Sequence, residues 1–90
     1  MGEVAIDIEA ELRADNPKTP AVTLRLYADA MRVYREAAAN VREHGAIVAH
    51  PRTGAPIENP YLAVMQRQAA TLHKMRVRGD RVLALLEAQP

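Results

Sequence analysis

Residues 19–45 read TPAVTLRLYADAMRVYREAAANVREHG and contain the strongest helix signal in the chain. It opens with Thr19 and Pro20, a capping residue followed by one suited to the first turn of a helix, and it closes at Gly45, which tolerates a positive φ. Apolar residues recur between these ends at steps of three and four, the spacing of one helix face. The main apolar row consists of Leu24, Tyr27, Met31, Tyr34, Ala38 and Val41. The pattern predicts a single helix of about seven turns.

A second apolar row lies beside the first on the same predicted helix. Its members are Leu26, Ala30, Val33 and Ala37. Together the two rows cover about half of the helix circumference, whereas a helix packed against one partner needs a stripe of only about 100°. We therefore expect this helix to contact more than one neighbour.

A second long helix is predicted to start at Asn59 and Pro60, which repeat the order of capping residue and proline. Its apolar row follows the same spacing and consists of Leu62, Met65, Ala69 and Leu72. Further along, Gly79 either lies inside a continuing helix, at a cost of about 1 kcal/mol relative to Ala, or marks a turn before a separate short helix. We prefer the turn, with Asp80 as the capping residue of the short helix.

The 16 residues at positions 45–60 connect the two predicted helices. Two short apolar runs flank the turn sequence PRTG at residues 51–54, which allows a small irregular hairpin, although Pro56 interrupts a regular ladder. Two long helices joined by a loop of this length are most simply antiparallel. The expected fold class is therefore all-α, an antiparallel helical hairpin with short flanking helices.

The N-terminal segment differs in charge from the rest of the chain. Residues 1–15 contain five acidic residues and one arginine, a net charge of −4, whereas the other 75 residues carry a net charge of +5. Val4, Ile8 and Leu12 are spaced by four residues, which is consistent with a short helix. We therefore divide the chain into an acidic arm or short helix at residues 1–18 and a helical-hairpin oligomerisation domain at residues 19–90.

The composition predicts one small domain with a thin core. The chain has 90 residues, only three aromatic side chains, all of them tyrosine, and no cysteine. A chain of this size buries only about 60–65% of the surface that its unfolded form exposes, so self-association is the expected additional source of stability. No apolar stretch reaches the roughly 20 residues that span a bilayer, and the N-terminus lacks the features of a signal peptide. We expect a soluble cytoplasmic protein.

The residues that common catalytic and metal sites require are nearly absent. The chain has no serine, no cysteine and no glycine-rich phosphate loop. Its three histidines, His44, His50 and His73, are too scattered for a zinc site. We therefore expect no enzymatic activity, no cofactor and no bound metal.

The basic residues of the two predicted helices differ in their acidic neighbours. On the first helix, Arg25 and Arg32 are each followed four residues later by an acidic residue, so this face neutralises itself. If the second helix continues, it carries a basic stripe with no acidic residue on its row, formed by Arg67, Lys74, Arg78 and Arg81. The stripe can contact DNA phosphates, or it can contact the acidic arm of its own or of a neighbouring subunit. The sequence favours neither alternative.

Five short motifs follow one another along the two helices and their loop. They are LYADA at residues 26–30, YREA at 34–37, EHG at 43–45, Gly54 and NPYL at 59–62. In this order they resemble the small subunit of the terminase of tailed phages and of phage-derived gene-transfer particles, over about residues 20–75. The resemblance implies a DNA-packaging protein without catalysis of its own. Such a protein forms a ring and presents DNA to the large terminase subunit, the ATPase and nuclease, in the cytoplasm of the bacterial host.

The same resemblance implies that the helical hairpin is the assembly core of the ring. The matching positions are Leu24, Tyr27, Met31, Tyr34 and Ala38 on the first helix and Leu62, Met65, Ala69 and Leu72 on the second. Many small terminase subunits carry an N-terminal helix-turn-helix domain for DNA, and residues 1–18 are too few and too acidic to form one. The chain therefore fits a short form of the family that binds double-stranded DNA without strong sequence specificity better than a form that recognises a specific DNA sequence. The alternative is a small helical protein-interaction module or regulator that does not bind DNA.

Overall fold

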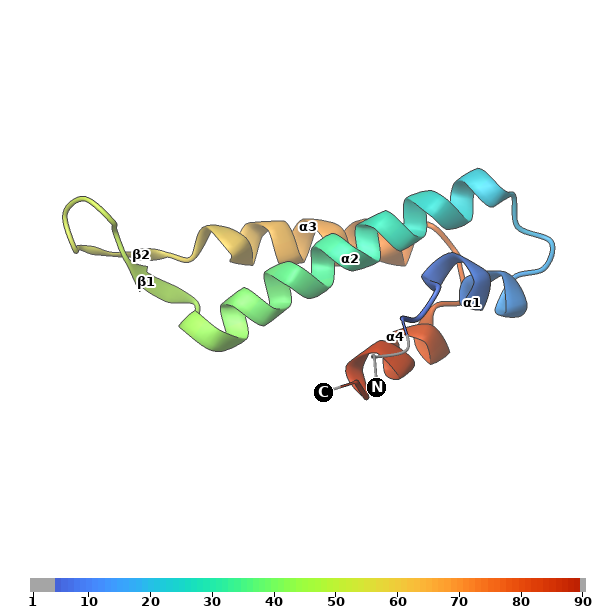
Figure 1. The fold of residues 1–90 in the computed structure, drawn as a ribbon. Helices are drawn as coiled ribbons and strands as arrows, with labels where there is room; N and C mark the ends of the chain where they lie inside the picture. The colour runs from blue at the N-terminus through green and yellow to red at the C-terminus, as the bar shows by residue number, and fades with distance from the viewer. Residues whose placement is uncertain (1–4, 90) are drawn as a thin grey trace.

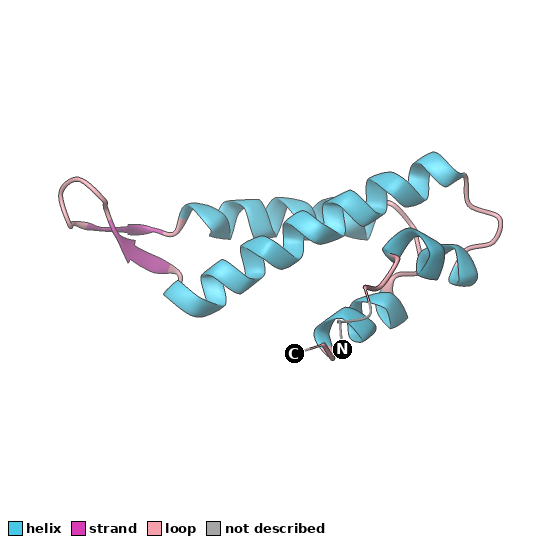
Figure 2. Ribbon diagram, viewed as in Figure 1, coloured by secondary structure: helices cyan, strands magenta, loops and turns pink. Residues whose placement is uncertain are grey.

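The computed structural model describes residues 5–89, which form an elongated, flat arrangement of helices with a small sheet at one end (Figures 1 and 2). In chain order the elements are α1 (Ile8–Asp15), α2 (Ala21–His44), β1 (Ile47–Ala49), β2 (Pro56–Glu58), α3 (Pro60–Lys74) and α4 (Asp80–Glu87). α2 and α3 lie side by side and antiparallel, with the strands beyond one end of the pair, α1 near the other end and α4 beside the middle of α2 (Figure 1). The mostly helical fold predicted from the sequence is confirmed.

α2 is the longest helix and runs almost between the predicted ends. It begins one position later than predicted, because Pro20 rather than Thr19 occupies the capping position, and no side chain caps it. It ends at Gly45, whose φ of +87° lies in the left-handed region that favours glycine and whose N–H donates to the Val41 carbonyl over 2.7 Å. Neither α2 nor any other described helix is long and apolar enough to cross a membrane.

α1 is a short helix within the acidic N-terminal segment. Its capping residue is Asp7, whose side chain accepts a hydrogen bond of 3.1 Å from the Ala10 N–H. Glu9 and Glu11 lie in the first turn, where the helix dipole favours negative charge. The sequence predicted this helix over residues 3–14; residues 3 and 4 lie outside the described part of the chain, and the helix begins at Ile8, after its capping residue, rather than before residue 5. Because α1 has only 8 residues, it depends on packing for its stability.

Asn59 joins α2 and α3 at the looped end of the helical hairpin. Its side-chain oxygen accepts a hydrogen bond of 2.9 Å from the Tyr61 N–H, as expected of the residue that caps α3. Its side-chain nitrogen donates to the Gly45 carbonyl over 2.9 Å and to Oδ1 of Asn40 over 3.0 Å. The side chain is 2% exposed. One buried amide therefore starts α3 and also ties it to the end of α2.

The loop between α2 and α3 forms the small hairpin that the sequence allowed, but as a regular two-stranded sheet rather than an irregular one, and this sheet adds to the helices that the all-α fold class predicted. Val48 pairs with Ile57 and Ala49 pairs with Pro56. The N–H of His50 donates to the Ala55 carbonyl over 2.8 Å, so His50 and Ala55 form a hydrogen-bonded pair. Hydrogen-bonded pairs alternate with non-bonded pairs in an antiparallel ladder, so the next pair, Ala49 and Pro56, is non-bonded and the Pro56 nitrogen faces away from β1. The proline therefore costs no ladder bond, because it lies on the outer edge of a two-stranded sheet.

The hydrophobic core lies where α1, α2 and α4 meet. Leu12, Leu24, Met31 and Val82 are each at most 1% exposed. The same cluster contains Ile8, Tyr27, Ala28 and Leu86. None of the residues of α3 is buried, although its Leu72 packs against the edge of this core. α2 contacts both α1 and α3, which confirms that its wide apolar surface serves more than one neighbour.

The chain leaves the helical path between α3 and α4, as the preferred alternative predicted. α3 ends at Lys74 and α4 begins at Asp80, with Gly79 rather than Asp80 in the capping position. A Cβ atom on Gly79 would overlap the Tyr27 side chain, whose Cε1 would lie only 2.7 Å away. Glycine is required here because α2 approaches the linker closely.

Candidate functional site

A long stretch of the chain carries charge of one sign only. Residues 59–79 contain no acidic side chain, although Glu58 and Asp80, which flank the stretch, are both acidic. The stretch forms α3 and the linker to α4. Its arginine and lysine residues are Arg67, Lys74, Arg76 and Arg78, and all four are exposed. No acidic side chain of the stretch itself therefore offsets these four positive charges.

Arg67 and Lys74 share the outer face of α3. They lie seven residues apart, which is two helical turns or about 10 Å along the axis, and so they project from the same side. The Thr71 hydroxyl donates a hydrogen bond of 3.0 Å to the backbone carbonyl of Arg67 and does not engage its guanidinium. Within residues 5–89 neither side chain has an acidic partner at ion-pair distance. Both cations are therefore available to an anion from outside the chain.

The basic stripe expected from the sequence does not continue as one helical row. Because α3 ends at Lys74, Arg78 lies on the linker and Arg81 lies on α4. Arg76, with a φ of +55°, lies where the chain turns out of the helix, and its exposed side chain adds a cation that the predicted stripe omits. The signal that could have identified Arg76 is the acid-free stretch to which it belongs.

Asn16 holds the backbone of the linker at Arg78. Its side-chain oxygen accepts a hydrogen bond of 2.9 Å from the Arg78 N–H, and its side-chain nitrogen donates to the Arg78 carbonyl over 2.9 Å. The same nitrogen donates to the Leu12 carbonyl at the end of α1 over 2.8 Å. Asn16 is 8% exposed, whereas Arg78 is exposed. The linker backbone is thus fixed to α1 while the Arg78 guanidinium faces solvent.

Arg81 differs from the other predicted DNA-binding residues because carboxylates of the same chain engage it. Its Nε donates to Asp15 Oδ2 over 2.9 Å, and its Nη2 donates to Glu11 Oε1 over 3.0 Å and to the Glu11 carbonyl over 3.2 Å. The hydrogen bonds to Asp15 and then to Glu11 raise the pKa of Arg81. Of the two alternatives that the sequence allowed, contact with the chain's own acidic segment is the one found for Arg81.

The exposed face of α2 is only partly neutralised. Arg32 pairs with Asp29, one turn before it, rather than with Glu36 as expected. Arg25 has no ion pair with any described carboxylate. The expected pairs of residues four positions apart are therefore not the ones that form, because the Asp29 side chain contacts Arg32, three residues later, instead of Arg25.

The apolar residues predicted for assembly divide into interior and surface positions. On α2, Leu24, Tyr27, Met31 and Ala38 are buried within the single chain, and Tyr34 is half-buried. On α3, the half-buried residues are Leu62, Met65 and Leu72, while Ala69 is exposed. The α2 row therefore forms the interior of the fold, and the α3 row keeps part of its surface open.

A different apolar row of α2 faces solvent. Val22 is 59% exposed, Leu26 58% and Val33 39%. Their spacing of four and seven residues places them on one side of the helix. Leu26 and Val33 belong to the second apolar row recognised in the sequence, whereas Val22 extends it towards the start of α2. Within residues 5–89 this row therefore keeps a large part of its apolar surface open to solvent.

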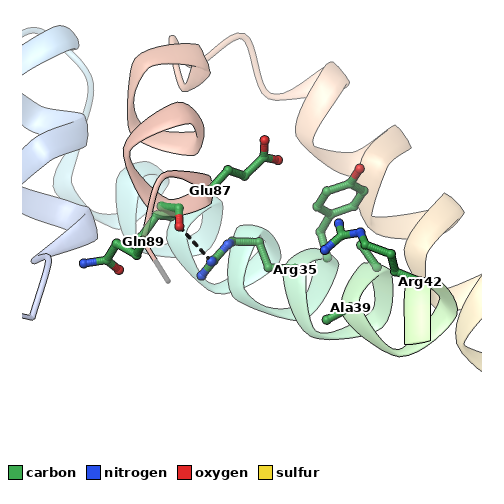
Figure 3. Close-up of a pocket in the computed structure, with 8 residues that line it drawn as sticks. Arg35, Ala39, Arg42, Glu87 and Gln89 are labelled. Carbon is green, nitrogen blue, oxygen red and sulfur yellow. Dashed lines mark hydrogen bonds between the residues drawn. The ribbon is translucent and has the colours of Figure 1, made fainter. Parts of the chain in front are cut away.

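A hollow of about 270 Å³ lies where the end of α4 meets α2 (Figure 3). Arg35 donates from Nη2 to the Leu86 carbonyl over 3.2 Å and so binds the negative end of α4. Arg42 lies further along α2, and Glu87 and Gln89 come from the end of α4 (Figure 3). The lining residues include no histidine, serine or cysteine. The hollow marks the attachment of α4 to α2.

Comparison with known proteins assigns the chain to a family. The family described as phage terminase, small subunit, matches residues 8–78. The match takes in α1, α2, the two strands, α3 and the linker as far as Arg78, and it stops before α4. Neither the curated proteins nor the solved structures contain a match to the chain. On the match across most of its length, the chain belongs to the family of phage terminase small subunits.

Proposed function

We propose that this chain is a non-catalytic subunit of a DNA-packaging machine that binds double-stranded DNA weakly and without strong sequence preference. Copies of the chain form a ring that presents DNA to the large terminase subunit, the ATPase and nuclease, in the cytoplasm of the bacterial host. Membership of the family supports a role in DNA packaging. The observation that carries DNA binding is that Arg67 and Lys74, exposed on α3 within the acid-free stretch, have no acidic partner at ion-pair distance among the described residues.

The proposed contacts are to phosphates rather than to base edges. A guanidinium and an ammonium group on an exposed helix face can each neutralise a phosphate. Arg76 and Arg78 extend the same positive surface onto the linker. Phosphate contacts position a protein on DNA without reading its sequence. One chain therefore offers a modest and strongly salt-dependent affinity.

Assembly into a ring would multiply these contacts. Each copy brings the same basic surface, and joining weak sites raises the overall affinity through effective concentration. The proposed assembly surface consists of the exposed α2 row of Val22, Leu26 and Val33 and the open side of the α3 row. The buried α2 residues support this surface from the interior. Covering it in a ring would also add apolar burial that the thin core of one chain lacks.

Charge reversal on α3 tests the DNA-binding proposal. We expect Arg67→Glu/Lys74→Glu to weaken binding to a labelled duplex of random sequence by about tenfold or more at moderate salt. The measurement is fluorescence anisotropy. The matched control is Arg25→Glu/Arg52→Glu, which changes the net charge equally at exposed positions outside the acid-free stretch. Equal affinities of wild type and Arg67→Glu/Lys74→Glu would refute the proposed contact surface.

Native mass spectrometry of the same proteins separates DNA contact from assembly. We expect the wild type and Arg67→Glu/Lys74→Glu to form rings of the same subunit number, because neither side chain belongs to the apolar rows. A chain that stays monomeric or dimeric at micromolar concentration and does not bind duplex DNA would instead favour the protein-interaction module.

A further inference from the structure

Three charged side chains join α1 to α4 and form what we call the acidic clamp, namely Glu11 and Asp15 of α1 and Arg81 of α4. Glu11 and Asp15 lie four residues apart and therefore on one face of α1. Both carboxylates engage the same guanidinium, at 3.0 Å and 2.9 Å. Two negative charges thus meet one positive charge, so the clamp has a net negative charge.

We propose that the acidic clamp restrains DNA binding by occupying Arg81, so that a DNA phosphate has to compete with Glu11 and Asp15 for this side chain. The inference rests on the proposed function and adds a regulatory element to it. A phosphate and a carboxylate recognise the same hydrogen-bond donors of a guanidinium, so they are direct competitors.

The two helices that carry the clamp are held together by packing. Leu12 of α1 and Val82 of α4 are each 0% exposed and belong to one core cluster. Asn16, directly after α1, is bonded to the linker backbone at Arg78. α1 therefore cannot leave α4 without opening the core. Competition by DNA requires only that the Arg81 side chain turn towards solvent.

Solvent reaches the clamp, so a phosphate can reach it too. The side chains of Arg81 and Glu11 are 47% and 41% exposed, and that of Asp15 is 26% exposed. Asp15 and Arg81 line a hollow of about 560 Å³ together with Arg78 and Asp80. The surplus negative charge of the clamp therefore lies beside Arg78 and weakens the attraction for DNA at this end of the basic surface.

The salt dependence of DNA binding by the full chain tests the clamp. Each added phosphate contact steepens the slope of log affinity against log salt by about 0.9. We expect Glu11→Gln/Asp15→Asn to add one contact, so that the ratio of affinities at 50 and 200 mM salt grows about 3.5-fold. Adding Arg81→Gln to this variant should restore the wild-type slope. Arg81→Gln alone should leave the slope unchanged, because the wild-type clamp withholds Arg81 from DNA.

A matched variant controls for the change of net charge. Glu36→Gln/Glu58→Gln also removes two acidic charges but leaves the clamp intact, and we expect it to keep the wild-type slope. Circular dichroism should show the same helix content in all variants, because glutamine and asparagine keep the size of the clamp residues and their ability to accept hydrogen bonds.

The outcomes distinguish the clamp from the proposed function. In a chain that binds DNA, an unchanged slope in Glu11→Gln/Asp15→Asn, or an equal increase in the control, overturns the clamp alone. A shallower slope in Arg81→Gln than in the wild type also overturns the clamp, because Arg81 would then contact DNA in the wild type. A wild type that does not bind DNA at any salt concentration overturns the proposed function and this inference with it.

Discussion

Tyr27 lies where α2, the linker and α4 meet. It is 7% exposed, and its ring leaves no room for a Cβ atom on Gly79. Burial, followed by the negative charge of Asp80, raises the pKa of its hydroxyl above the usual value of 10.0. The unfolded chain therefore releases this proton at a lower pH than the folded chain. The stability linked to the neutral hydroxyl is complete below pH 10.0 and is lost as the pH rises through the pKa of the folded state.

We expect Tyr27→Phe to reduce the loss of stability at alkaline pH, because phenylalanine has no proton to release. Urea titrations at pH 8 and about pH 11, at one protein concentration, should show a smaller fall in the free energy of unfolding for this variant than for the wild type. Tyr61→Phe is the control, because Tyr61 is 47% exposed. Identical alkaline losses in Tyr27→Phe and the wild type would argue against this account.

At the scale of the elements, Asn59 determines how α2 and α3 are joined. We expect Asn59→Ala to lower the free energy of unfolding by about 2 kcal/mol, because it removes the cap of α3 and the two hydrogen bonds that the Asn59 side chain donates to Gly45 and Asn40. Asn59→Asp should also destabilise the fold, since it keeps the acceptor for Tyr61 but loses both donated hydrogen bonds.

Asn40→Ala provides the comparison for both Asn59 variants. Asn40 is only half-buried and shares one hydrogen bond with Asn59, so its loss should cost less. Urea denaturation followed by circular dichroism at fixed protein concentration measures all three variants. If Asn59→Ala were no less stable than Asn40→Ala, the amide would not hold the two helices together.

At the scale of the whole molecule, the flat shape leaves apolar side chains on the surface. The principal extents are 50 × 37 × 17 Å, and α3 lies against α2 without a buried residue of its own. Val22, Leu26 and Val33 form an exposed apolar row on α2. A second copy of the chain is the proposed cover for this row.

We expect Leu26→Glu/Val33→Glu to reduce the ring to smaller species while the helix content stays unchanged, because both side chains are exposed in the single chain. Native mass spectrometry and circular dichroism make the two measurements. Ile47→Glu, which places a charge at the most exposed of the large apolar residues described, is the control and should keep the ring. A ring that persists in Leu26→Glu/Val33→Glu would move the assembly surface away from this row.

Local sequence determined most of the secondary structure. Asn59 with Pro60 starts α3 and Gly45 ends α2 because capping bonds and a positive φ depend only on neighbouring residues. The turn sequence at residues 51–54 indicated a small hairpin, but its regular pairing could not be predicted in the same way. Whether Pro56 costs a ladder bond depends on the register between strands, and the register depends on which residues meet across the loop.

The absence of negative charge from residues 59–79 can be read directly from the order of the amino acids. Which of the predicted cations stay free depends on how the helices pack. The carboxylate partners of Arg81 lie 66 and 70 positions before it, and a contact over such a distance leaves no periodic pattern in the chain. It arises because the buried packing of α1 and α4 around Leu12 and Val82 brings the acidic face of α1 to Arg81.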